Sequence, residues 1–144
     1  MGYPTDVRAK SQSLNRGYSG EWGASGADIP ETTIVDVVPL RSKAGELLAA
    51  RVLTNRKELI LIIELEGAGI ARNYRESPNG FMNGYGYCGK HGFWDLAMYD
   101  TVNDKYILEF KGPMRFGSSI KVKLENPAGA TAKASCDVEW VENT

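Results

Sequence analysis

Residues 116–141 alternate apolar and polar side chains with a period of two, and this pattern restricts the fold more than any other feature of the chain. Ile120, Val122 and Leu124 share one side of a first run, and lysines and glutamates fill the other side. After a turn at residues 126–129, a second run places four residues inward: Ala134, Cys136, Val138 and Trp140. Because side chains alternate across a strand, each run predicts a strand with one buried and one solvated face. The short turn predicts that the two strands pair as a closing hairpin.

Strand patterns also fill the middle of the chain. Residues 32–38 are rich in β-branched side chains and end at Pro39, which cannot continue a central strand. Residues 47–53 fit a strand or a short helix, because they contain good helix formers. Residues 94–99 and 105–110 flank a turn rich in Asp and Asn, which predicts a hairpin.

Residues 58–66 are apolar on both faces at their start. Ile60 and Ile62 lie on one face, and the other face consists of Leu59, Leu61, Ile63 and Leu65. Such a strand needs cover on both sides at one end, which a single sheet cannot provide. The chain is therefore predicted to be all-β, an antiparallel β-sandwich or jelly roll of about seven to eight strands.

Residues 1–32 differ in pattern from the β-sandwich domain expected at residues 33–144. The segment holds five glycines and two prolines and shows no sustained period. Its large apolar side chains are spaced apart, which indicates an extended N-terminal arm that anchors on a surface, since a disordered tail normally has few aromatics. That surface is either a neighbouring subunit or the arm's own domain. The interface residues predicted on the arm are Tyr3, Val7, Leu14, Tyr18 and Trp22.

Residues 67–92 read as a long loop, and loops beyond about 12–15 residues in compact domains are usually functional or disordered. In residues 79–94 glycines alternate with aromatics, which combines backbone freedom with flat contact surfaces. The loop therefore predicts a protein interface or a site that stacks on sugar rings. The alternative is that its aromatics fold back over one end of the sandwich. The residues predicted to form the contact are Phe81, Tyr85, Tyr87, His91 and Trp94.

Composition and motifs argue against an enzyme, a cofactor or a metal. Seventeen basic and 18 acidic residues give a net charge of −1, which disfavours nucleic-acid binding and polybasic membrane binding. No apolar run approaches the roughly 18 residues of a membrane span, and the N-terminus lacks the plan of a signal peptide. Gly84 to Gly89 match a dinucleotide-binding spacing, but no helix pattern follows them. Cys88 and His91, with Cys136 as a third ligand, fall short of the four ligands of a structural zinc site.

Residues 116–129, followed by the second alternating run, resemble the closing hairpin of tailed-phage virion β-sandwich proteins. These include decoration (cement) proteins and jelly-roll domains of capsid or tail components. The extended arm ahead of the sandwich is similar in plan. The resemblance implies a virion location, a structural role and self-association, often as trimers, with a major capsid or other virion protein as the further partner.

Two functions from different classes follow. The first is a non-enzymatic capsid decoration or minor capsid component, which stabilises the particle through arm and loop contacts with neighbouring subunits. An arm that orders on a neighbour loses chain entropy but wraps a large surface, and many weak contacts add in a lattice. The alternative is a carbohydrate- or receptor-binding module that presents a glycan site in residues 79–94.

Overall fold

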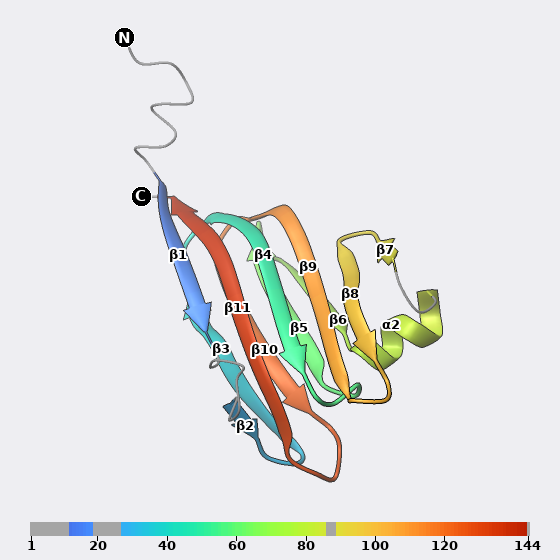
Figure 1. Ribbon diagram of the computed structural model, residues 1–144. Coiled ribbons are helices and arrows are strands. Elements are labelled where there is room, and N and C mark those ends of the chain that lie inside the picture. The colour runs from blue at the N-terminus through green and yellow to red at the C-terminus, as the bar shows by residue number, and fades with distance from the viewer. Residues whose placement is uncertain (1–11, 19–26, 86–88, 144) are drawn as a thin grey trace.

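The computed structural model describes residues 12–18, 27–85 and 89–143, with residues 12–18, 27, 85 and 89 described through their backbone alone. Over these residues the chain forms two antiparallel sheets that pack face to face (Figure 1). The predicted all-β sandwich is therefore confirmed. The described residues hold more strands than the seven to eight expected, because short strands form in segments that were predicted to be arm or loop.

The larger sheet has seven strands in the order β1-β11-β4-β9-β8-β7, with β2 paired alongside β11. Its strands are β1 (Gln12–Tyr18), β2 (Ala27–Ile29), β4 (Gly45–Thr54), β7 (Gly89–His91), β8 (Trp94–Asp100), β9 (Lys105–Phe116) and β11 (Ala132–Asn143). The segment that fitted a strand or a short helix is thus a strand, β4. The predicted hairpin around the Asp- and Asn-rich turn is confirmed as β8 and β9.

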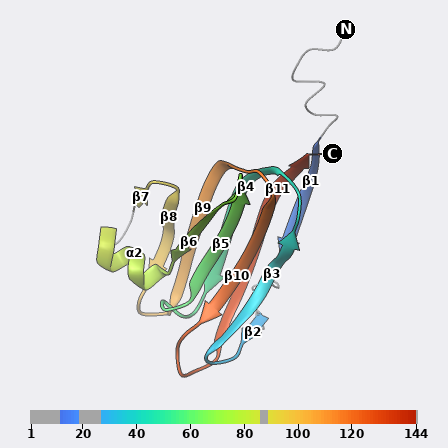
Figure 2. The ribbon, with the colours of Figure 1, turned by 180° about the vertical axis from the view of Figure 1, so that it is seen from behind.

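The smaller sheet has four strands in the order β3-β10-β5-β6, and it faces the viewer when the molecule is seen from behind (Figure 2). Its strands are β3 (Thr33–Arg41), β5 (Ile60–Gly67), β6 (Ile70–Glu76) and β10 (Ser119–Asn126). One helix, α2 (Pro78–Tyr85), follows β6 and contacts β8 and β9.

The core lies between the two sheets and is built from the predicted inward positions. Those positions on β5, β9, β10 and β11 are almost fully buried: Leu61, Ile63, Leu65, Tyr106, Leu108, Phe110, Ile120, Val122, Leu124, Ala134, Cys136, Val138 and Trp140. Ile62 points outward from β5 yet is only 4% exposed. Its cross-strand neighbours are Arg75 and Lys123, whose aliphatic stems can cover it.

The predicted closing hairpin of β10 and β11 is wrong. β10 lies between β3 and β5 in the four-stranded sheet, whereas β11 pairs with β4, β1 and β2 in the other. Residues 127–131 carry the chain from one sheet to the other. Sheets pack about 10 Å apart, a gap that five extended residues span easily. The alternation of apolar and polar residues shows which face of each strand is buried. Because that pattern is the same whether the two strands pair as a hairpin or lie in opposite sheets, it could not distinguish the two arrangements.

The long loop predicted at residues 67–92 is also wrong, because most of it is regular structure. Ala68 and Gly69 adopt positive φ values of 54° and 74°, which suits a tight two-residue hairpin turn from β5 into β6. Ser77 then caps α2: its hydroxyl oxygen accepts a hydrogen bond of 2.9 Å from the Gly80 N–H, and Pro78 occupies the first helical position.

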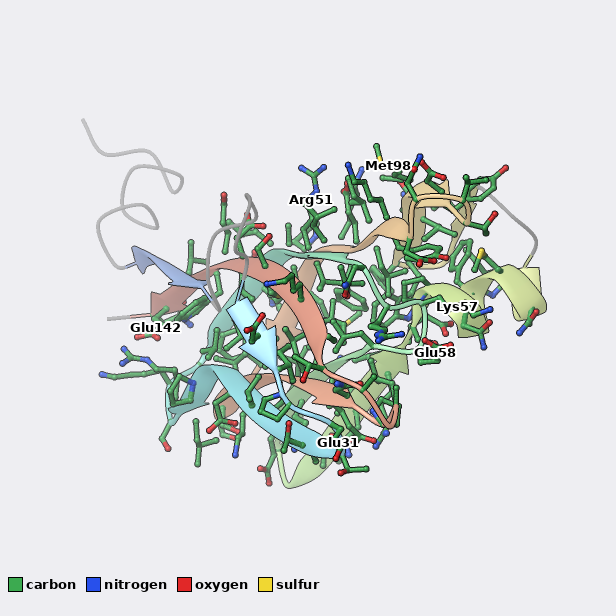
Figure 3. All side chains as sticks on the ribbon, turned by 60° about the horizontal axis from the view of Figure 1, so that its bottom comes forward. Glu31, Arg51, Lys57, Glu58, Met98 and Glu142 are labelled. Carbon is green, nitrogen blue, oxygen red and sulfur yellow. The ribbon has the colours of Figure 1, made fainter. Side chains whose placement is uncertain are left out.

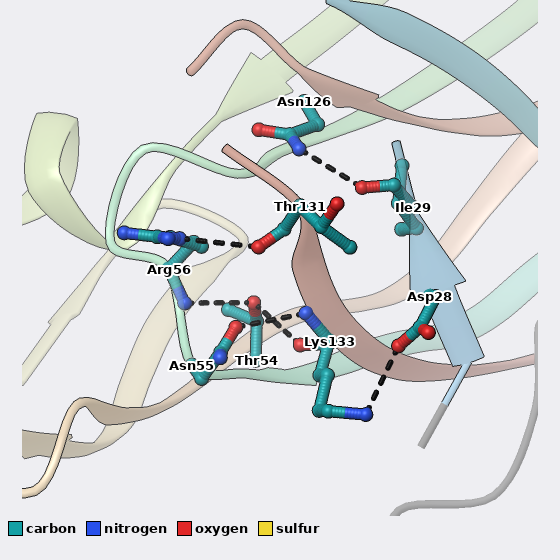
Figure 4. A network of polar contacts seen from close by, with 8 residues as sticks. All are labelled: Asp28, Ile29, Thr54, Asn55, Arg56, Asn126, Thr131 and Lys133. Atoms are coloured by element: carbon teal, nitrogen blue, oxygen red, sulfur yellow. Dashed lines mark hydrogen bonds and ion pairs between the residues drawn. The ribbon is translucent and has the colours of Figure 1, made fainter. Parts of the chain in front are cut away.

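A polar network fastens β2 to the rest of the sandwich (Figure 4). The buried Asn126 side chain donates hydrogen bonds to the carbonyls of Ile29 at 3.0 Å and Pro30 at 3.2 Å. Lys133 forms an ion pair of 3.0 Å with Asp28. β1 and β2 both pair with β11, so the described parts of residues 1–32 lie on the sandwich of their own chain. The boundary at residue 32 between an arm and a domain stays a prediction.

A buried carboxylate joins the two sheets at the other end. Arg41 on β3 donates hydrogen bonds of 2.8 Å from Nε and from Nη2 to the two oxygens of Glu142 on β11. The Trp140 indole N–H donates a third, also at 2.8 Å. Glu142 is only 5% exposed, and the hydrogen bonds from Arg41 lower its pKa below the ordinary value. The charge is therefore held by a bidentate partner in the opposite sheet.

Candidate interaction surface

Phe110 on β9 is the centre of an aromatic cluster at the β6 and β8 side of the sandwich. The ring of Trp94 meets it edge-on with centroids 4.9 Å apart. Tyr74 from β6 lies at 5.3 Å, and Phe93 stacks on it at 5.5 Å. These separations are those of stabilising aromatic pairs. The aromatics at the end of the predicted loop therefore fold back in part onto the core.

The five residues predicted for the loop contact are not brought together on one surface. Phe81 lies in α2 and is fully buried in the core. His91 is exposed on β7, opposite the half-buried Trp94. The side chains of Tyr85 and Tyr87 lie outside the described residues. The expectation that some of these aromatics cover the sandwich is met by Phe81 and Trp94.

The predicted arm residues are described only in part. Leu14 and Tyr18 lie on β1, where they pair with Val141 and Asp137 of β11. Their side chains are not described. Tyr3, Val7 and Trp22 lie outside the described residues. Their role as interface residues stays a prediction.

Four exposed apolar side chains lie along β8 and the turns at its two ends, on both faces of the sheet: Tyr99 stands opposite the buried Tyr106, and Met98 opposite the outward Ile107. Phe93 is 42% exposed, Met98 44%, Tyr99 39% and Val102 88%. We call these four residues the β8 surface. Met98 on the outer face and Val102 at the turn are the members of this set that solvent reaches without cover from the core aromatics, and exposed apolar groups of this kind are candidates for protein contact. None of these four is among the residues predicted for the loop contact, and Met98, Tyr99 and Val102 lie beyond the predicted range of residues 79–94.

Met98 faces outward because β8 is irregular. The pairing of β8 with β9 shifts register between Leu96 and Met98, and such bulges re-aim the side chains that follow them. Met98 then stands opposite Ile107, which in turn pairs with Leu53 of β4. Met98 and Arg51 point away from the sandwich on the same side (Figure 3). An apolar row thus runs across the outer face of the larger sheet and ends at the β8 surface.

A charged row borders this apolar row. Arg51 forms an ion pair of 3.5 Å with Glu109, and Lys111 bridges Glu109 at 3.5 Å and Asp95 at 3.6 Å. A shallow hollow of about 220 Å³ lies beside it, lined by Arg51, Leu53, Ile107, Ser135 and Asp137. The charges beside the apolar row are therefore largely paired, and they do not give it a strong field of either sign.

The outer face of the four-stranded sheet has a different character. Opposite charges pair across its strands: Lys123 with Glu64 at 2.8 Å, Arg75 with Glu125 at 3.2 Å and Lys121 with Asp36 at 3.8 Å. A hollow of about 370 Å³ lies over the face and is lined mostly by polar groups. Partly exposed pairs of this kind are typical of a solvated sheet face.

The residues considered for metal and thiol chemistry are Cys88, His91 and Cys136. Cys136 is a free thiol, and its burial raises its pKa far above the usual range, which makes it unreactive. Cys88 lies outside the described residues. Within the described ranges no group of three or more His, Cys, Asp or Glu side chains gathers to hold a metal ion. In the same part of the chain, no helix has the length and apolarity needed to cross a bilayer.

No family model matches the chain. No curated protein matches it either. Solved structures show a distant likeness over 92% of this chain. A subviral particle of VP2 from infectious bursal disease virus aligns with a TM-score of 0.44 at 9% identity, and the Gx strain of that virus with 0.40 at 12%. A complex of Aeromonas sobria serine protease with the chaperone ORF2 aligns with 0.34 at 9%. The chain spans 33%, 32% and 27% of those chains.

Proposed function

We propose that this chain is a non-enzymatic structural protein of a virus particle, a decoration (cement) or minor capsid component. It stabilises the particle through contacts with neighbouring subunits, and its partners are copies of itself and a major capsid or other virion protein. The sequence resemblance to tailed-phage virion β-sandwich proteins motivates the proposal.

The observation that carries the proposal is the β8 surface. Val102 is 88% exposed at a turn, and Met98 is 44% exposed at the end of an apolar row on the sheet. Burying these side chains against another protein would remove apolar area from water, which favours association by about 25 cal/mol for each Å². Because the backbone of both residues belongs to a hairpin of the sandwich, the ordering cost of binding is mainly that of the side chains.

Glycan binding has weaker support. It requires aromatic rings that present a free face, and Trp94 is one of the aromatic residues predicted for the loop contact. Trp94 is half-buried and meets Phe110 at 4.9 Å. The residue therefore contributes to the core more than to a sugar platform.

The test is incorporation of tagged chain into particles of the virus that encodes it. A double variant, Met98→Gln with Val102→Ser, is expected to reduce incorporation by about tenfold or more, because it removes about two apolar contacts. The matched control is Leu40→Gln with Ile34→Ser, which changes side chains of 61% and 55% exposure on the other sheet. Equal loss in both variants, or full incorporation of the first, would contradict the role of the β8 surface.

A further inference from the structure

Within the described residues, the β6 strand forms a regular open edge of the sandwich. It runs for seven residues without a proline or a shift of register, and it pairs on one side with β5. Two of the other edge strands are shorter or irregular: β7 has only three residues, and β3 contains Pro39 and pairs irregularly. The far edge of the larger sheet is regular along β1 but is shared with the separate short strand β2. Natural sheets use short strands, prolines, bulges and charged side chains to prevent edge pairing. β6 has charged side chains, Arg72, Arg75 and Glu76, but none of the other three.

The hydrogen-bonding groups on this edge can be assigned from the hairpin. Gly67 pairs with Ile70 across the two-residue turn, so alternate residues from Ile70 onward bond to β5. The Glu66 carbonyl supports this assignment. It accepts a hydrogen bond of 2.8 Å from the Ser118 N–H on the β10 side, so Glu66 and its partner Ala71 do not bond to each other. Three residues therefore direct their N–H and C=O groups away from the sheet, and all three are exposed: Ala71, Asn73 and Arg75.

We propose that β6 pairs with β6 of a second copy of the chain, antiparallel, about a two-fold axis at Asn73. In this register Asn73 faces its own counterpart, and Ala71 faces the second copy's Arg75. Every free N–H and C=O group of these three residues then has a partner. The four-stranded sheets of the two copies become one continuous sheet.

The side chains of β6 fit this pairing. Arg75 faces an alanine, and Arg72 faces a tyrosine, so no two arginines are directly opposed. Arg72 is already held within its own chain, where its guanidinium donates to the Arg115 carbonyl. In this register, residue 71 faces residue 75 and residue 72 faces residue 74. Arginines at both members of either pair would place like charges opposite one another. The sequence of β6 is therefore compatible with itself as a partner.

This inference rests on the proposal that the chain assembles with itself, and it names the strand that does so. It uses a different surface from the one tested for incorporation into particles. A defect at β6 changes self-association, whereas a defect at the β8 surface changes attachment to other proteins.

The test is sedimentation of the full chain over a series of concentrations. Ala71→Glu places a carboxylate opposite the second copy's Arg75 and is expected to tighten the dimer by about tenfold. Ala71→Lys places like charges there and is expected to weaken it by about tenfold. Each substitution acts twice in a two-fold contact. Asn73→Pro removes the N–H at the axis, which β5 does not use, and is expected to abolish the dimer.

The two Ala71 variants form a matched pair, because a folding defect cannot tighten association in one and weaken it in the other. Thermal unfolding by circular dichroism checks the fold of each variant. A wild-type dimer that is indifferent to all three substitutions would overturn β6 pairing and leave self-assembly to another surface. A monomer at every concentration, in wild type and Ala71→Glu alike, would overturn both self-association and β6 pairing, while incorporation into particles would still be decided by its own experiment.

Discussion

Glu142 shows how one residue can fix the relation between two sheets. Its carboxylate lies almost fully buried on β11, and the guanidinium that neutralises it comes from β3 in the opposite sheet. Removing one partner of such a pair leaves a buried polar group without its bond, which costs more than the pair itself contributes. The interaction was not visible in the sequence, because Arg41 and Glu142 are 101 residues apart.

We expect Glu142→Gln to lower the free energy of unfolding by about 1–3 kcal/mol near neutral pH, because an amide cannot replace the charged acceptor for Arg41. The folded-state pKa of Glu142 is lowered, so this stabilisation is present above the ordinary value of 4.5 and is lost as the pH falls through the folded-state pKa. The difference between wild type and variant should therefore shrink in acid.

Denaturant unfolding at a series of pH values measures this difference. The matched control is Glu31→Gln at an exposed turn, which should change stability little at any pH. A constant difference between wild type and Glu142→Gln down to strongly acidic pH would contradict the assignment.

At the scale of elements, the sequence predicted which face of each strand is buried better than it predicted which strands pair. The alternation in β9, β10 and β11 placed the buried side chains correctly, because burial alternates along a strand whatever its neighbour is. It could not show that β10 and β11 belong to different sheets. β6 was missed because its inward positions include Arg72 and Glu76, so its alternation is hidden by charge.

The start of α2 had a readable signal. Ser77 followed by Pro78 is the residue order of a helix cap and first turn, and glycines inside the helix concealed it. Among the residues of the β8 surface, Val102 had a signal as well, since it is an apolar residue in a turn of polar ones. Met98 had none, because its direction depends on a register shift that appears only in the paired strands.

Ser77→Ala should lower the free energy of unfolding by about 0.5–2 kcal/mol, because the Gly80 N–H loses its acceptor at the helix start. Since α2 carries Phe81 into the core, a frayed first turn should also loosen that side chain. Thermal unfolding of the variant measures the change, with Ser42→Ala at an exposed position as the control. Equal stability of the two variants would show that the cap does not stabilise the helix.

At the scale of the whole molecule, the N-terminal segment is part of the sandwich as well as a candidate arm. β1 and β2 together line β11, and Ile29 at the end of β2 is only 2% exposed within the core. The two surfaces proposed for assembly lie toward the opposite side, since Tyr74 of β6 and Trp94 of β8 both contact Phe110. β1 and β2 thus lie on one side of the molecule, and β6 and β8 lie toward the other, where α2 and β7 are also found (Figure 1).

Deletion of residues 1–32 should lower the free energy of unfolding by about 2–5 kcal/mol, the range for losing one large buried aliphatic side chain. The deletion removes Ile29 from the core and leaves the Asn126 amide without two of its acceptors. Deletion of residues 1–11 is the matched control, because it keeps β1 and β2. Chemical unfolding of both should separate them, and equal stability would show that β1 and β2 do not contribute.

The most direct test of a structural role in a virus particle is the copy number of this chain in purified particles, measured by quantitative mass spectrometry against the major shell protein. The account predicts a fixed ratio between the two proteins that persists through successive rounds of purification. A chain that is absent, or that declines to a trace as purification proceeds, would contradict the central claim.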